Sequence, residues 1–430
     1  PPACCMEIEN GRIRISKYWS LHSFEGSLSG EEAVESIDRE LQRATQLQMI
    51  SDVPLGAYLS GGIDSSILVA MMAKVSSRPV ETFSIVWDAD SKAFDERSYA
   101  RFVAESYRTN HHEFVVKPEI EDVMENIIRS FDEPFADDSA IPNYYIARET
   151  RKHVTVALSG LGGDEMSAGY ERYLGMRLLN LYRVLPMRLR AGVIAKAIQD
   201  LPDSKTGSLW RERIKRFVRI SDLPFEESYF TISSKVEPAE KAGLFTQEAL
   251  RAMGEVDDTP ARFRELASEC GGADQLSRML YIDMNTYMVD QLLVLSDRMS
   301  MAHSLELRVP YLDHHLVETF ARVDSSMKLR GFVKKYLLKK VAERYFPKSF
   351  IYRKKMGFSS PIVLWLRKDL RGYMLHLLNR KAMERTGVID PDTVQRYVDE
   401  HLNCQHNNDM KLWSIMMFML WYDSYILRIY

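Results

Sequence analysis

The stretch Ser60-Gly61-Gly62-Ile63-Asp64-Ser65-Ser66 decides the fold of this chain. It follows a short apolar run over 55–59 and precedes a longer one over 67–75, so it predicts a strand, a glycine turn and a helix start. The two glycines let the backbone approach an anion closely, and the helix start presents free N–H groups and a positive dipole end to that anion. The three serines add hydroxyl donors, and Asp64 is placed to bind a magnesium ion. The stretch therefore predicts a phosphate-binding loop.

A second glycine turn follows a β-branched run over 153–158. It reads Ser159-Gly160-Leu161-Gly162-Gly163-Asp164-Glu165 and leads to Ala168-Gly169-Tyr170 and Arg172-Tyr173. A Gly-Gly pair or the string GGDE alone is more typical of an ordinary tight turn followed by a capped helix. Two such turns in this order are more specific, and both aspartates are expected on exposed loop ends.

The order of the expected elements predicts an α/β fold with a doubly wound parallel sheet. Strands are expected at 57–60, 82–87, 112–116 and 154–158, and they alternate with helices at 65–75, 96–107, 120–131 and 143–152. A capping-box pattern at Ser29 predicts a further helix before the first strand. Both glycine turns then lie at the carboxyl edge of the sheet, where such sheets bind ligands. From about Leu174 the pattern predicts helices only.

Composition predicts a cytoplasmic enzyme that binds neither nucleic acid nor membrane. With 430 residues, 46% of them hydrophobic, the chain can bury a large core, and its net charge of -3 gives no general attraction to nucleic acid. The four cysteines form no CxxC pair, which fits a reducing compartment. No apolar run nears the roughly 18 residues of a membrane helix, and the N-terminal residues do not resemble a signal peptide.

These motifs resemble the glutamine-hydrolysing asparagine synthetase family. The string SGGxDS is similar to the pyrophosphate loop of ATP pyrophosphatases, which activate substrates as adenylates, and SGxGGDE followed by GY is similar to the second nucleotide loop of asparagine synthetases. Residues 297–313 resemble the family's DRMSMAHSLExRVPFLD, residues 353–366 its RxKxGFxxPxxxWL, and residues 334–339 its KxxLR, with Lys339 in place of the arginine. The match runs from about Asp52 to the C terminus.

The resemblance implies a site for ATP and Mg²⁺. Asp64 and Asp164 would share the metal and the pyrophosphate, and Lys355 is the first candidate for the lysine that stabilises the departing pyrophosphate, with Lys335 as the second. The resemblance assigns the contacts with the nucleotide to Leu59, Ser60, Gly61, Gly62, Asp64, Ser65, Ile85, Ser159, Gly160 and Lys335.

The resemblance also implies a domain division. Residues 1–22 resemble the tail and linker of the family's glutaminase domain, and 23–430 its synthetase domain, with an α/β core over 23–173 and a mainly helical part over 174–430. The family's glutaminase nucleophile is an N-terminal cysteine that uses its own amine, whereas residue 1 here is proline and Cys4 and Cys5 have no free amine beside them. The chain is therefore expected to use ammonia, or glutamine-derived ammonia if a glutaminase domain is supplied. Two copies of the chain could also associate as a homodimer.

Leu161 departs from the family pattern. Asparagine synthetases place an acidic residue at this position to position or deprotonate the acceptor, and leucine can do neither. Either another residue, such as Glu165 or Asp297, supplies that function, or the acceptor is not free aspartate. Arg308 is expected to pair with an anionic acceptor or with a structural carboxylate.

The resemblance implies an ATP-dependent amide-forming ligase. It would activate a carboxylate, most simply the aspartate side chain, as an acyl-adenylate that ammonia opens. The alternative within the family is an amidotransferase acting on another carboxylate, such as a sugar acid in a polysaccharide pathway. A tRNA-modifying adenylating enzyme would need a basic patch and often a cysteine pair, and neither is evident. A degenerate nucleotide-binding scaffold is disfavoured by the intact Asp64, Asp164 and Lys355.

Overall fold

The computed structural model describes residues 1–21, 26–87, 97–116, 120–199, 210–254, 258, 260–353 and 362–428. Within these residues a five-stranded parallel sheet has the order β5-β4-β3-β6-β7. The strands are β3 (Leu55–Tyr58), β4 (Glu81–Trp87), β5 (Asn110–Val116), β6 (Val156–Leu158) and β7 (Glu306–Arg308). The chain builds outward from β3 to β5 and then returns to the other side of β3 with β6. Such a reversal leaves a crevice at the carboxyl ends of the two central strands.

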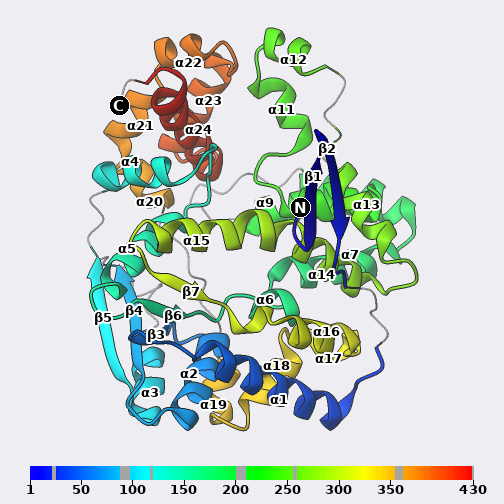
Figure 1. Cartoon of the computed structure of the whole chain (residues 1–430). Helices are drawn as coiled ribbons and strands as arrows, with labels where there is room; N and C mark the ends of the chain where they lie inside the picture. The colour runs from blue at the N-terminus through cyan, green and yellow to red at the C-terminus, as the bar shows by residue number, and fades with distance from the viewer. Residues whose placement is uncertain are drawn as a thin grey trace.

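Helices cover both faces of this sheet. Four lie on one side, namely α1 (Gly30–Gln48), α2 (Ile63–Val75), α3 (Arg97–Tyr107) and α18 (Tyr336–Ala342), while α5 (Ala140–Thr150) and α15 (Val294–Met301) lie on the other (Figure 1). Helix α2 is buried along Ser65–Met72 because β3, α1, α3 and α18 all pack around it. This packing explains why its sequence is apolar without a helical period.

The predicted α/β fold is confirmed, and the ends of the predicted elements lie within three residues of the observed ends. Ser29 does occupy the N-cap position of α1, but its side chain makes no capping hydrogen bond, so the predicted capping box is wrong in that detail. The expectation of helices only after Leu174 is also wrong, because β7 adds a strand beside β6. A strand of three residues is too short to produce a recognisable alternation of apolar and polar positions.

The rest of the chain is mainly helical. The remaining helices are α4 (Ile120–Ser130), α6 (Gly163–Met166), α7 (Glu171–Arg183), α8 (Ala195–Gln199), α9 (Trp210–Arg219), α10 (Phe225–Ser233), α11 (Pro238–Leu244), α12 (Gln247–Met253), α13 (Ala261–Glu269), α14 (Gln275–Asn285), α16 (His314–Arg322), α17 (Ser325–Lys328), α19 (Lys348–Ile351), α20 (Ile362–Arg367), α21 (Arg371–Leu377), α22 (Arg380–Thr386), α23 (Pro391–Leu402) and α24 (Asp409–Trp421). The 3₁₀-helices are η3 (Ile220–Asp222) and η5 (Pro310–Leu312), and the π-helices are η2 (Arg188–Ile194), η4 (Tyr287–Leu293) and η6 (Tyr422–Ile426).

Helix α24 is the centre of the C-terminal helices. It contacts α4, α20, α21 and α23, and its Leu412, Trp413 and Met416 are almost completely buried (Figure 1). This packing accounts for the apolar sequence of the helix. In the described part of the chain, no helix combines the length and the apolar character that crossing a bilayer requires.

An antiparallel hairpin of β1 (Cys4–Glu9) and β2 (Arg12–Lys17) precedes the α/β core. Almost all of its residues are exposed. The segment after it is fixed by Trp19, whose indole N–H donates to the Glu318 carboxylate at 2.9 Å. The division of the chain at residues 22 and 173 stays a prediction.

Candidate functional site

The first glycine turn joins β3 to α2. Gly61 has a φ of +77°, and a Cβ atom there would lie 2.9 Å from the backbone nitrogen of Ala100, so this position requires glycine. The Ser65 hydroxyl lies 3.0 Å from that of Ser60, and both residues face a cavity. Ser66 is different: its buried hydroxyl donates to the Gly62 carbonyl at 2.6 Å, so its predicted role as a phosphate donor is wrong.

The second glycine turn joins β6 to α6 and touches the first. A Cβ atom at Gly160 would lie 2.7 Å from the backbone nitrogen of Ser65, so the close approach of the two turns requires glycine here. The Ser159 N–H donates to the Arg308 carbonyl at 2.8 Å, which ties this turn to the end of β7. The strand that sequence reasoning missed therefore supports the second turn.

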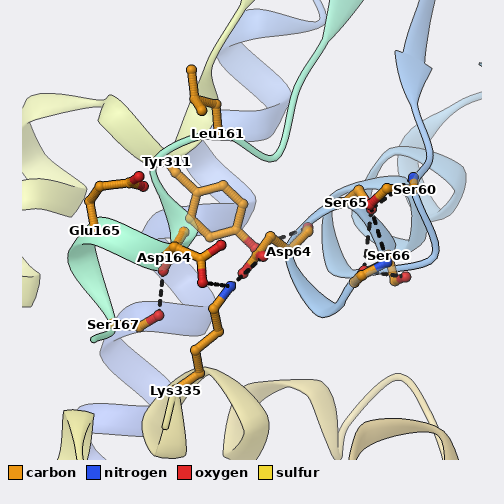
Figure 2. Close-up of polar contacts among 12 residues, drawn as sticks. Ser60, Asp64, Ser65, Ser66, Leu161, Asp164, Glu165, Ser167, Tyr311 and Lys335 are labelled. Carbon is orange, nitrogen blue, oxygen red and sulfur yellow. Dashed lines mark hydrogen bonds and ion pairs between the residues drawn. The ribbon is translucent and has the colours of Figure 1, made fainter. Parts of the chain in front are cut away.

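Two carboxylates and a lysine meet where the turns converge. The Lys335 ammonium lies 2.5 Å from Asp64 Oδ2 and 2.8 Å from Asp164 Oδ1 (Figure 2). The Asp64 and Asp164 side chains are only 13% and 18% exposed, so the expectation of exposed loop ends is wrong. Lys335 itself is buried just before α18, in a left-handed backbone conformation with φ of +53°.

This environment keeps Lys335 charged. Burial lowers the pKa of its ammonium, but the carboxylates of Asp164 and Asp64 outweigh burial, so the pKa is raised above its usual range. Sequence reasoning ranked Lys335 below Lys355 as the functional lysine. The structure brings Lys335 into contact with both carboxylates, whereas Lys355 lies outside the described residues.

The two carboxylates fit a hard cation. Asp64 Oδ1 is buried and has no hydrogen-bond partner, because Lys335 binds the other oxygen. A Cβ atom at Gly163 would lie 2.5 Å from Asp64 Oδ1, and one at Gly169 would lie 1.8 Å from Asp164 Oδ1, so these glycines keep space around both carboxylates. Magnesium typically takes one or two carboxylates plus phosphate oxygens. Within the described ranges, no group of three or more His, Cys, Asp or Glu side chains could hold a metal ion.

A cavity of about 1100 Å³ opens beside this cluster. Most of the predicted nucleotide contacts line it, namely Leu59, Ser60, Gly62, Asp64, Ser65, Ile85, Ser159 and Gly160. Gly61 and Lys335 are not among the described lining residues, but Lys335 contacts Asp64 and Asp164, which are. The cavity continues away from the glycine turns to α10, α13 and η4, where Phe230, Lys235, Phe263 and Tyr287 line it. It is larger than the pockets that usually hold one drug-sized ligand.

Leu161 lines the cavity, and its side chain points away from Lys335 (Figure 2). Glu165 and Asp297 are the two residues suggested to supply the acid-base function that leucine lacks. Asp297 is exposed on α15 and is not among the described residues that line the cavity, so that suggestion is wrong. Glu165 is buried, and its carboxylate accepts a hydrogen bond from the hydroxyl of Tyr170, which does line the cavity. Burial, and then the charge of Asp164, raise the pKa of Glu165 to about 7.

Arg308 has a structural role. Its guanidinium pairs with Glu306 at 2.6 Å and donates to the carbonyl oxygens of Gln48 and Ile50, both at 2.7 Å. Of the two alternatives for this residue, the structural carboxylate is therefore the observed partner. The contacts attach β7 to the end of α1.

Sequence reasoning missed a buried polar network in the far wall of the cavity. Arg172 lines the cavity and lies 2.8 Å from Asp283 Oδ2, and the hydroxyls of Tyr173 and Tyr229 donate to the same oxygen at 2.5 and 2.7 Å. These residues come from α7, α10 and α14. Only the Arg172-Tyr173 pair after the second glycine turn hinted at this wall, because its partners are distant in sequence.

Comparison with known proteins agrees with this geometry. The model of the family described as asparagine synthase matches residues 36–423. The chain is 30% identical over 422 residues to asparagine synthetase (glutamine-hydrolyzing) 1 of Bacillus subtilis, covering 98% of this chain and 64% of that protein. It is 31% identical over 394 residues to a putative asparagine synthetase (glutamine-hydrolyzing) of Mycobacterium tuberculosis, covering 91% of this chain and 58% of that one.

A more distant similarity is to amidase chyE of Penicillium rubens, at 24% identity over 437 residues, 91% of this chain and 62% of that protein. The chain thus spans somewhat less than two thirds of the length of these relatives. The family match nevertheless covers most of the chain and includes both glycine turns and Lys335. With the order of the sheet and the position of the two turns, it establishes that this chain belongs to the asparagine synthase family.

Proposed function

We propose that this chain is an ATP-dependent ligase that converts a carboxylate to an amide. The acceptor carboxylate attacks the α-phosphorus of ATP and expels pyrophosphate, and ammonia then opens the acyl-adenylate to give the amide and AMP. The observation that carries the proposal is the convergence of Asp64 and Asp164, one from each glycine turn, on the buried ammonium of Lys335. Such a cluster suits a polyphosphate that arrives with a divalent cation.

The residues at the two turns would each bind a different part of the nucleotide or the metal ion. The backbones of Leu59 and Ile85 would hold the adenine end of the nucleotide, and Ser60 and Ser65 would donate to its phosphates. Asp64 and Asp164 would hold the magnesium ion, which supplies positive charge to the phosphoryl oxygens when bound. Lys335 would keep the two carboxylates apart and in place.

Charge on the departing pyrophosphate needs a cation beside it. Lys335 is already buried and protonated at this point, and Lys355 remains the proposed lysine that acts in the transition state. A lysine in a site that excludes water stabilises developing negative charge far better than one in bulk water.

Aspartate is the first candidate acceptor, because the relatives are named for asparagine synthesis. Another carboxylate, such as a sugar acid, is the second candidate. Two observations favour it: Leu161 offers no acid-base group, and the cavity extends well beyond the glycine turns toward Phe230 and Tyr287. The tRNA-modifying and scaffold alternatives find no comparable support.

The test is pyrophosphate release by the purified chain with ATP, Mg²⁺, ammonium and a panel of carboxylic acids that contains aspartate and several sugar acids. Asp64→Asn should abolish release. Asp297→Asn is the matched control, because it makes the same substitution at an exposed position of α15 and should leave release unchanged. Release that persists in Asp64→Asn, or that fails with every acid in the wild-type chain, would contradict the proposal.

A further inference from the structure

Arg353 contacts the outer side of the first glycine turn, 292 residues away in sequence. Its guanidinium carbon lies 4.0 Å from the centre of the Tyr99 ring and 4.2 Å from that of Phe350. One of its terminal nitrogens donates to the Phe350 carbonyl and the other to the Gly61 carbonyl. The side chain thus links α3 and the end of α19 to the turn between β3 and α2.

The Gly61 carbonyl belongs to a peptide bond that also affects the cavity side of the turn. In a trans peptide the carbonyl of one residue and the N–H of the next point in opposite directions, and the described residues contain no cis peptide bond. Arg353 holds the Gly61 carbonyl on the outside, so the Gly62 N–H faces inward and donates to the Ser60 hydroxyl at 3.2 Å. Ser60 and Gly62 both line the cavity.

A glycine-glycine peptide has little intrinsic reason to keep this orientation. Glycine adopts positive and negative φ with similar ease, so the peptide plane between Gly61 and Gly62 could rotate and turn a carbonyl oxygen toward the cavity. A carbonyl oxygen there would repel a phosphate that the N–H attracts. The bond from Arg353 opposes this rotation, and the contacts with the Tyr99 and Phe350 rings hold the guanidinium that makes the bond.

We propose that Arg353 is a positioning residue of the phosphate loop, which fixes the Gly61–Gly62 peptide so that its N–H faces the nucleotide phosphates. The inference rests on the proposed function, because it assumes that the phosphates of ATP bind at this turn. Lysine would replace arginine poorly, since it lacks the planar group that contacts both rings while donating to two carbonyl oxygens.

Binding measurements separate phosphate positioning from a general structural effect. Isothermal titration calorimetry on the full chain would compare inorganic pyrophosphate, Mg-ATP and adenosine, which has no phosphates. Arg353→Gln should weaken binding of pyrophosphate and Mg-ATP about tenfold or more and leave adenosine binding within about twofold. The substitution removes the charged hydrogen bond to the Gly61 carbonyl, which orients only the part of the site that would bind phosphates. Arg353→Lys should show a smaller loss. The KM for ATP in pyrophosphate release should rise more than kcat falls.

Arg396→Gln is the matched control, since it removes another arginine that lies over a tyrosine ring, with its guanidinium carbon 5.3 Å from the Tyr397 ring centre. It should bind all three ligands as the wild type does. Equal weakening of adenosine and pyrophosphate in Arg353→Gln, or no weakening of either, would overturn the inference. A wild-type chain that binds neither Mg-ATP nor pyrophosphate would instead refute the proposed function itself.

Discussion

Replacing Lys335 with methionine should destabilise the protein by about 3–5 kcal/mol, the usual effect of removing one partner from a buried ion pair. Methionine preserves most of the volume of the side chain but not its charge. Asp64 and Asp164, whose side chains are 13% and 18% exposed, would then face each other without the ammonium that now separates them. Unfolding entropy near 2.1 cal/mol/K per residue gives about 0.9 kcal/mol/K for 430 residues, so the melting temperature should fall by about 3–6 °C.

The assay is thermal unfolding at about pH 7.5 without nucleotide or divalent cation, followed by fluorescence. Lys339→Met is the control, because Lys339 lies one turn further along α18, with its ammonium 5.5 Å from the Tyr352 ring centre. Burial and the charges of Lys334 and Lys335 lower the pKa of Lys339, so its neutral replacement should cost little.

Adding Mg²⁺ should restore part of the lost stability in Lys335→Met, because a cation can take the place of the ammonium between the two carboxylates. It should raise the melting temperature of the wild type less. The reasoning is refuted if Lys335→Met melts within about 1 °C of Lys339→Met, or if Asp64→Asn combined with Lys335→Met is less stable than Lys335→Met alone, since neutralising one carboxylate should relieve the repulsion.

Three further predictions concern other parts of the chain. Burial, and then the charge of Arg367, lower the pKa of His401 to about 4. In the unfolded chain the pKa of this histidine is near 6.5, so the neutral imidazole stabilises the fold above about pH 6.5. This stabilisation, about 3 kcal/mol in total, is lost as the pH falls toward 4. His401→Leu should remove this loss in urea unfolding at about pH 7 and 4.5, whereas the exposed His376→Leu should not. Lys355→Ala should lower the turnover of pyrophosphate release about 100- to 1000-fold with a smaller effect on ATP affinity, and a change within about twofold would move the role to another cation. Leu161→Glu should raise aspartate-dependent turnover if aspartate is the acceptor, and no gain together with activity on a bulkier acid would favour the second candidate.

The glycine turns were predictable because their signals are local. A strand, two glycines and a helix start occupy adjacent positions, so the sequence around Gly61 and Gly160 contains most of the information that places them at the carboxyl edge of the sheet. Alternation of apolar runs predicted the parallel sheet for the same reason. Element ends differed by a few residues, since helix and strand termini depend on contacts outside the local window.

What escaped prediction depends on contacts between distant segments. Lys335 lies 271 residues after Asp64, its partner. The neighbouring Lys334 pairs instead with Glu171, and no feature of the sequence around the two lysines shows which of them contacts the aspartates. The three residues of β7 form a strand only because β6 offers them a free edge. The Arg172–Asp283 wall likewise joins helices far apart in sequence, so no window could reveal it.

The distance along the chain between Asp64 and Lys335 also has a consequence during synthesis. Ribosomes add roughly 5–20 residues per second, so about 15–55 s pass between the synthesis of these two residues, which are 271 positions apart. Once Asp164 has been made, the nascent chain has both carboxylates but no lysine between them, and the sheet lacks its β7 edge until residue 308 is made. Nucleotide binding should therefore appear late in translation, after the protein has already formed most of its α/β core, and nascent chains that end before Lys335 should retain ATP poorly.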